Sequence, residues 1–290
     1  MTRFKTLLHR EWMQHHRGWL LLMTLPPALL LVVLLFGGTI QAEPNHPLAL
    51  MILSTVGISG LVLVITWLAV LLQAGGLARR DQQDRSIEFW LSLPVGHAQS
   101  LAATLLMHAL AMPLLALTIG FASSQLIAQL VVWRVTGSAG WAELPWLTLL
   151  PLACGLFLRA ALGVVLATAW MLPLLLVPMA CSAWLKRWGV PIAVAGTAIL
   201  HGLLAKLYGI TVIGDTLHGW LVGASRSMIS TPPPGWDEHT FSIDTPRIPG
   251  WLFGDAGHSI ALMAQPLFLA SLVVSAACFG LLVLRRRAGA

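Results

Sequence analysis

The residue types best suited to metal binding gather in the polar segment 209–258. Asp215 and His218 are three residues apart, and Asp255 and His258 repeat this spacing near the end of the segment. Residues three apart share a face of a helix, so each pair could give two ligands to one transition-metal ion. A polar loop also collects Asp and His side chains that bind no metal, and we favour that simpler interpretation.

A second set of polar side chains lies inside long apolar stretches. These residues are His108, Gln125, Gln129 and His201. Polar side chains within membrane helices usually face the interior of the bundle or a water-filled cavity. These four residues are therefore candidates for a translocation path through a membrane. Hydrogen bonds between neighbouring helices are the commoner role of such residues, and we favour that role for this set.

One short stretch has a composition suited to covalent catalysis. Residues 57–60 read Gly-Ile-Ser-Gly and resemble the Gly-x-Ser-Gly of rhomboid intramembrane proteases, with His201 as the candidate base for Ser59. A Ser–His pair requires hydrogen-bond contact, which a sequence does not define. Small residues in an apolar helix more often form a surface for helix packing, which is the role we expect here.

The elements that position these residues must be membrane helices. Of the 290 residues, 57% are apolar and only 10% are charged, whereas about 25% are charged in soluble globular proteins. The mean hydropathy is +0.82. The chain therefore cannot cover a water-facing surface with charge. Its three cysteines lie in apolar runs and form no recognisable disulfide framework.

Six apolar stretches predict an all-α polytopic membrane protein with a single permease-like domain over residues 1–290. The predicted spans are residues 19–38, 48–72, 100–131, 160–184, 190–208 and 259–284. Residues 1–18 are amphipathic and predict a helix on the inner surface. The apolar segment 145–158 is followed by Arg159, which would cost about 2.5–3.5 kcal/mol at mid-bilayer. We therefore expect Arg159 at an interface and 145–158 to be re-entrant or interfacial.

The outer loop 209–258 contains an internal similarity. Gly219-Trp220-Leu221-Val222-Gly223 matches Gly250-Trp251-Leu252-Phe253-Gly254. We expect two short helices there, in a large outer element between spans five and six, with Trp220 and Trp251 anchored at the membrane interface.

The basic residues predict the orientation of the chain. Twelve of the 17 lysines and arginines fall on the side that holds both termini, and five fall on the other side. By the positive-inside rule, both termini are cytoplasmic, which indicates a multi-pass protein of a bacterial inner membrane. The net charge of +6 thus reflects topology, and no nucleic-acid partner is expected.

The predicted cytoplasmic loop 73–99 holds the most informative motif. Residues 84–95 read Asp-Arg-Ser-Ile-Glu-Phe-Trp-Leu-Ser-Leu-Pro-Val. On a helix, Ile87, Trp90 and Leu91 share an apolar face. A helix of about ten residues is marginal in water unless it packs on something. Residues 79–93 carry three acids and three arginines, so anionic lipid attracts them weakly. A protein partner is the better candidate.

This motif resembles the coupling helix of type-2 ABC transporter permeases. Those permeases share an amphipathic N-terminal helix, six spans, cytoplasmic termini and a large outer element before the last span. The resemblance implies a permease dimer, here a homodimer, bound to two copies of a separate ATPase subunit. The residues it assigns to the ATPase contact are Asp84, Arg85, Ile87, Glu88, Phe89, Trp90 and Leu91. One departure is that Gly96, His97 and Gln99 stand where the family often has basic residues.

No lysine of this sequence follows glycine, so the Gly-Lys-Ser/Thr of a P-loop is missing. We therefore expect ATP and Mg²⁺ on the partner ATPase and no cofactor on this chain. The sequence thus predicts a non-enzymatic permease subunit of an ATP-driven exporter. The alternatives are a rhomboid-like serine protease and a secondary transporter, although the inverted repeats of the latter are not recognisable.

Overall fold

A computed structural model describes residues 3–37, 47–83, 96–235 and 244–288. Within these ranges the chain is helical and contains no strand, as the sequence predicts. The long helices are α1 (Arg3–Phe36), α2 (Pro47–Gln83), α5 (Met112–Ala142), α6 (Trp146–Leu185), α7 (Gly189–Tyr208) and α10 (Pro266–Ala288). The shorter ones are α4 (His97–Leu105), the π-helix η1 (Leu106–Ala111), α8 (Val212–Met228) and α9 (Ile248–Ala261). Three short 3₁₀ helices are η2 (Lys186–Trp188), η3 (Thr245–Arg247) and η4 (Leu262–Ala264).

Local sequence explains several helix boundaries. Pro47 and Pro266 are the first residues of α2 and α10, where a missing N–H and a fixed φ cost nothing. At the other end of a helix, Gly209 follows α7 with a φ of 67°, a left-handed conformation that glycine adopts without strain. The chain therefore turns at once into α8.

Five helical stretches in the described residues are long and apolar enough to cross a membrane. They are Phe4–Phe36, Pro47–Arg79, His97–Ala142, Trp146–Tyr208 and Pro266–Ala288. The protein is accordingly a multi-pass helical membrane protein. The fourth stretch contains two of the predicted spans, 160–184 and 190–208, so the six-span count stays a prediction.

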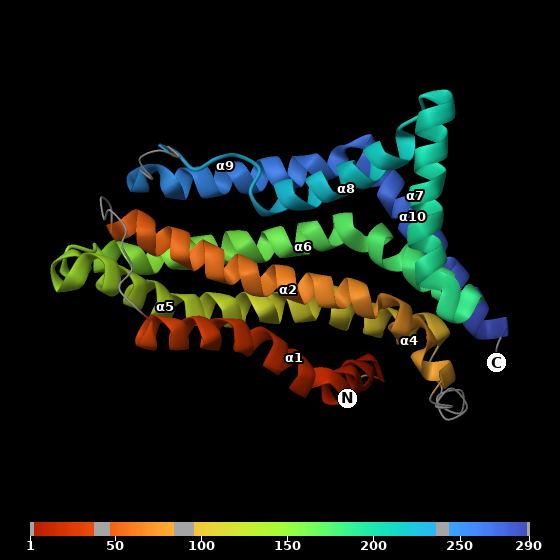
Figure 1. Ribbon diagram of the computed structural model, residues 1–290, viewed down its shortest axis with the longest axis horizontal. Helices are drawn as coiled ribbons and strands as arrows, with labels where there is room; N and C mark the ends of the chain where they lie inside the picture. The colour runs from red at the N-terminus through yellow and green to blue at the C-terminus, as the bar shows by residue number, and fades with distance from the viewer. Residues whose placement is uncertain (1–2, 38–46, 84–95, 236–243, 289–290) are drawn as a thin grey trace.

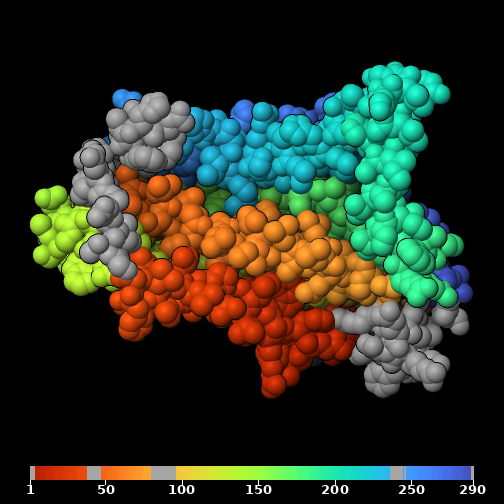
Figure 2. Space-filling view, in the orientation of Figure 1, coloured from red at the N-terminus to blue at the C-terminus, as the bar shows by residue number. Residues whose placement is uncertain are grey.

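Most helices run lengthwise along one bundle, in which α2 packs against both α5 and α6 (Figure 1). By contrast, α7 crosses one end of the bundle at a steep angle to α6, so the predicted span 190–208 does not lie antiparallel beside α6. Helix α10 ends at that same end, and α1 begins nearer to it than to the opposite end. Helix α7 extends beyond the rest of the molecule (Figure 2), and apolar residues such as Ile199, Leu203 and Leu207 are exposed on it.

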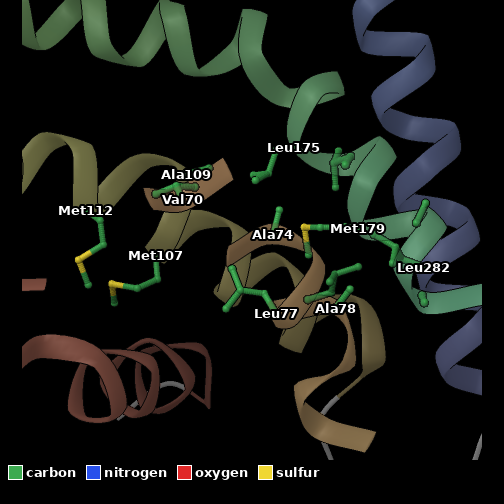
Figure 3. Close-up of a cluster of buried hydrophobic side chains, with 14 of the residues drawn as sticks. Val70, Ala74, Leu77, Ala78, Met107, Ala109, Met112, Leu175, Met179 and Leu282 are labelled. Carbon is green, nitrogen blue, oxygen red and sulfur yellow. The ribbon is translucent and has the colours of Figure 1, made fainter. Parts of the chain in front are cut away.

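The largest hydrophobic cluster lies where α1, α2, η1, α5, α6 and α10 meet. Its labelled members in Figure 3 are Val70, Ala74, Leu77, Ala78, Met107, Ala109, Met112, Leu175, Met179 and Leu282. Ala74 and Met179 are completely buried. Small side chains on α2 let the long Met and Leu side chains of the neighbouring helices fill the space between the backbones.

The structure corrects three predicted boundaries. The predicted interfacial helix 1–18 and the first span form one continuous helix, α1. Segment 145–158 is neither re-entrant nor a separate surface segment, because α6 continues from Trp146 through Arg159 to Leu185. The predicted loop 73–99 is shorter, because α2 continues to Gln83 and α4 begins at His97.

Candidate functional site

A buried ion pair joins α6 to α9. The side chain of Arg159 on α6 is 5% exposed and that of Asp255 on α9 is fully buried. Nε and Nη2 of Arg159 donate to Oδ2 of Asp255 at 2.8 and 2.5 Å. Arg159 is therefore buried within the protein, and its expected place at a membrane interface stays a prediction. The carboxylate compensates the arginine inside the protein, so α6 need not end there.

The remaining polar atoms of this pair are also hydrogen-bonded. Arg159 donates to the Ser227 carbonyl at 3.1 Å and to Oγ of Ser259 at 2.6 Å. Oδ1 of Asp255 accepts bonds from the backbone N–H groups of Ser230 and Thr231, at 2.9 and 2.7 Å, and from both of their hydroxyls. The network thus includes the end of α8 and the two residues that begin the next loop.

These bonds determine the ionisation of Asp255. Burial alone raises the pKa of the carboxyl group. The hydrogen bonds from Ser230, Thr231 and Arg159 lower the pKa by more, so that the net result lies below the ordinary value of 3.8. Asp255 is consequently ionised near neutral pH and forms a true ion pair with Arg159.

A groove of about 830 Å³ lies beside the ion pair, between the first half of α6 and the start of α9. Its walls are almost entirely apolar, with Leu152, Leu158 and Leu162 from α6 facing Leu252 and Phe253 from α9. Arg159 is the charged residue among those that line it. Chemically, the groove suits an acyl chain or another elongated apolar group.

The structure does not bring the candidate protease residues together. Ser59 is buried between α2 and α5, where its hydroxyl donates to the Thr55 carbonyl at 2.7 Å and to Ser124 at 3.3 Å. His201 lies on α7 with its ring against Gly214 of α8. Among the described residues, Ser59 and His201 share no hydrogen bond. The arrangement instead fits the helix-packing role.

The four intramembrane polar residues lie at separate places. His108 is fully buried in η1, near α1. Gln125 lies on α5 beside a cavity of about 20 Å³ that Thr55 and Leu149 also line, and Gln129 is one turn further along α5. His201 lies on α7. No shared translocation path follows from these four positions.

The Asp and His residues of segment 209–258 are also distributed. Asp255 belongs to the ion-pair network, whereas Asp215 is exposed and accepts a bond from Thr211 at 2.7 Å. In the described part of the chain, the ligand atoms that come within metal-binding range belong instead to Glu11, His15 and His108. Glu11 and His15 were not among the predicted site residues, although their i,i+4 spacing on an amphipathic helix is present in the sequence.

Both expected helices of segment 209–258 are present, as α8 and α9, but one of the tryptophans is placed differently. Trp220 is buried in a cluster with Trp170 and Phe268 rather than anchored at an interface. Trp251 is half-buried and donates to the Thr231 hydroxyl at 3.1 Å. The predicted coupling residues Asp84–Leu91 lie outside the described residues.

Comparisons of this chain with protein-family models, with curated proteins and with solved structures give no match. The fold thus defines a multi-pass helical membrane protein, in which the Arg159–Asp255 network lies next to an apolar groove.

Proposed function

We propose that this chain is the membrane-spanning permease subunit of an ATP-driven ABC exporter. It works as a homodimer in a bacterial inner membrane and couples to two copies of a separate ATPase subunit. ATP binding by the ATPase moves the segment 84–93, and this movement switches a cavity between the two permease copies. The chain itself does no chemistry.

The observation that carries the proposal is the motif Asp84–Val95 and its position in the chain. Its flanking helices, α2 and α4, end and begin near the end of the bundle where α10 ends (Figure 1). The last turn of α10 there carries Arg285, Arg286 and Arg287. This concentration of basic residues supports a cytoplasmic location for the motif, which an ATPase contact requires.

The exposed apolar surface of α7 (Figure 2) supports the dimer, because a second permease copy can cover part of it while lipid covers the rest. The apolar groove beside Arg159 supports an amphiphilic substrate, since its walls are almost entirely apolar and a charged residue lies among them.

The test is co-purification of the ATPase with the tagged full-length chain in mild detergent. Truncating a large aromatic residue at an interface commonly costs about 2 kcal/mol or more, which is roughly a 30-fold loss of affinity. We expect Trp90→Ala to lose the co-purifying P-loop subunit and its ATP hydrolysis. Glu88→Lys should weaken the complex less and in a salt-dependent way, because rim charges tune association more than affinity.

Trp188→Ala is the matched control, because Trp188 is an exposed tryptophan in the 3₁₀ turn between α6 and α7, outside the motif. It should retain both the ATPase and its activity. Wild-type binding and coupled activity in Trp90→Ala would remove the main support for the permease assignment.

A further inference from the structure

Three potential metal ligands from two helical segments converge at the buried junction of α1 and η1. Glu11 and His15 are four residues apart on α1 and therefore share a face. His108 approaches them from η1. One ligand atom from each side chain lies within 4.8 Å of the other two. Glu11 and His108 are completely buried and His15 is half-buried, so this is not a group of surface charges that meet by chance.

The same ring nitrogen, Nδ1, of each histidine lies within hydrogen-bond distance of a backbone carbonyl. Nδ1 of His15 lies 3.2 Å from the Glu11 carbonyl oxygen, and Nδ1 of His108 lies 3.0 Å from the Thr104 carbonyl oxygen. A carbonyl oxygen only accepts, so each Nδ1 is the donor of its bond, and in the neutral imidazole Nε2 then has the lone pair. Metal-binding histidines commonly donate their second ring N–H to such a backbone carbonyl, which fixes the tautomer and the ring orientation.

Further contacts hold the side chains in place. The hydroxyl of Thr104 donates to Oε1 of Glu11 at 3.2 Å, and Arg10 donates to the same oxygen. A carboxylate has about four lone-pair positions, so these bonds do not exhaust its capacity as a ligand. The rings of His15 and His108 meet edge to face with centroids 5.1 Å apart, and the rings of Trp19 and His108 do so with centroids 6.0 Å apart.

We propose that Glu11, His15 and His108 bind one divalent transition-metal ion of the zinc type. Two imidazole nitrogens and one carboxylate oxygen suit Zn²⁺ better than Ca²⁺ or Mg²⁺, which prefer oxygen ligands alone. Ligand atoms around tetrahedral zinc stand about 3.3 Å apart, so binding draws the three side chains together by about 1.5 Å at most. Water completes the fourth position.

The ion connects two parts of the chain that are far apart in sequence. It links the N-terminal half of α1 to η1, and π-helical segments within α-helices frequently occur at functional sites. Because the unfolded chain has no such site, zinc binding adds stability to the folded state. The ion therefore holds α1 against η1, which is joined to residues 84–95 through α4.

The test uses the full-length protein in detergent after removal of metal with a chelator. Titration with Zn²⁺ alone should give one tightly bound ion per chain and raise the Tm. Co²⁺ should bind at the same stoichiometry and give the visible absorption of a tetrahedral N/O site. We expect His15→Gln and His108→Gln to weaken Zn²⁺ binding at least 100-fold and to abolish the zinc-dependent rise in Tm.

His16→Gln is the matched control, because His16 follows His15 on α1 but its Nδ1 faces the Trp12 and Met13 carbonyls outside the group. It should bind Zn²⁺ as the wild type does. If His108→Gln fails to fold, the Zn²⁺ affinity of His15→Gln tests the proposal by itself. His15 is only half-buried, so its replacement should disturb the fold less. Absence of Zn²⁺ binding by the wild type, or wild-type binding by His15→Gln, would overturn the proposal.

Discussion

Arg159 and Asp255 lie 96 residues apart in the sequence, yet two nitrogens of the arginine side chain bind the same carboxylate oxygen of the aspartate. Each oxygen of Asp255 has its own set of partners, because Oδ2 faces Arg159 and Oδ1 faces Ser230 and Thr231. An arginine in the middle of an apolar helix is tolerable only with such compensation. The pair is therefore a requirement of the fold as well as a feature of the site.

Replacing Asp255 by alanine should destabilise the protein strongly. The change leaves Arg159 buried without a counter-charge, and breaking a buried pair in this way costs about 3–5 kcal/mol. Denaturant unfolding in detergent micelles measures the loss. Asp215→Ala is the control, because Asp215 is exposed and accepts a hydrogen bond from Thr211, and it should change stability by about 0.5 kcal/mol at most. Equal effects of the two substitutions would contradict the structural role of the pair.

The lowered pKa of Asp255 predicts how stability depends on pH. A carboxyl group that binds protons less tightly in the folded state stabilises the fold above its unfolded pKa of 3.8. This stabilisation disappears as the pH falls through the lower folded pKa. The Tm difference between wild type and Asp255→Asn should accordingly be constant from about pH 7 to pH 5 and shrink below about pH 4. A difference that stays the same down to pH 2.5 would show that the carboxylate charge contributes nothing.

Gly223 should not tolerate a larger side chain. A Cβ atom at this position of α8 would lie 2.5 Å from the ring of Trp170 on α6. Gly223→Ala should thus cost about 1–3 kcal/mol through overpacking. Gly57→Ala is the matched control, since nothing lies within 4 Å of its added Cβ. That helical substitution should be neutral or stabilising by about 0.5–1 kcal/mol. Unfolding of both variants in detergent compares them directly, and tolerance at both sites would contradict the close packing of α8 on α6.

The proposed orientation predicts which residues an impermeant reagent reaches in intact cells. In a variant without its three native cysteines, a cysteine at Ser242 should react with an impermeant maleimide. A cysteine at Ser92 should react only after the membrane is permeabilised, because the positive-inside rule puts residues 79–97 in the cytoplasm. Permeabilised cells provide the control for both positions. The reverse labelling pattern would invert the topology and remove the basis for an ATPase contact at residues 84–93.

Sequence reasoning predicted the helical class and the apolar helices well, because hydrophobicity over about 20 residues is a local property. It did not predict the burial of Arg159, because the cost of a buried charge depends on a partner 96 residues away, which the sequence does not indicate. The same limit applies to Trp220, whose burial depends on the approach of Trp170 and Phe268. The spacing of Glu11 and His15 was readable, but the approach of His108 was not.

The bonds of Asp255 also have a mechanical consequence. Through one side chain they connect α6 and α9 to Ser230 and Thr231, which follow α8. These segments should therefore move as a single rigid body. Helix α6 also packs against α2 through apolar residues such as Val70, Leu175 and Met179. Apolar surfaces slide past one another without breaking directed bonds. Any large motion of this protein should therefore displace α2 relative to the segments that Asp255 connects, and the hydrogen bonds of Asp255 should stay intact.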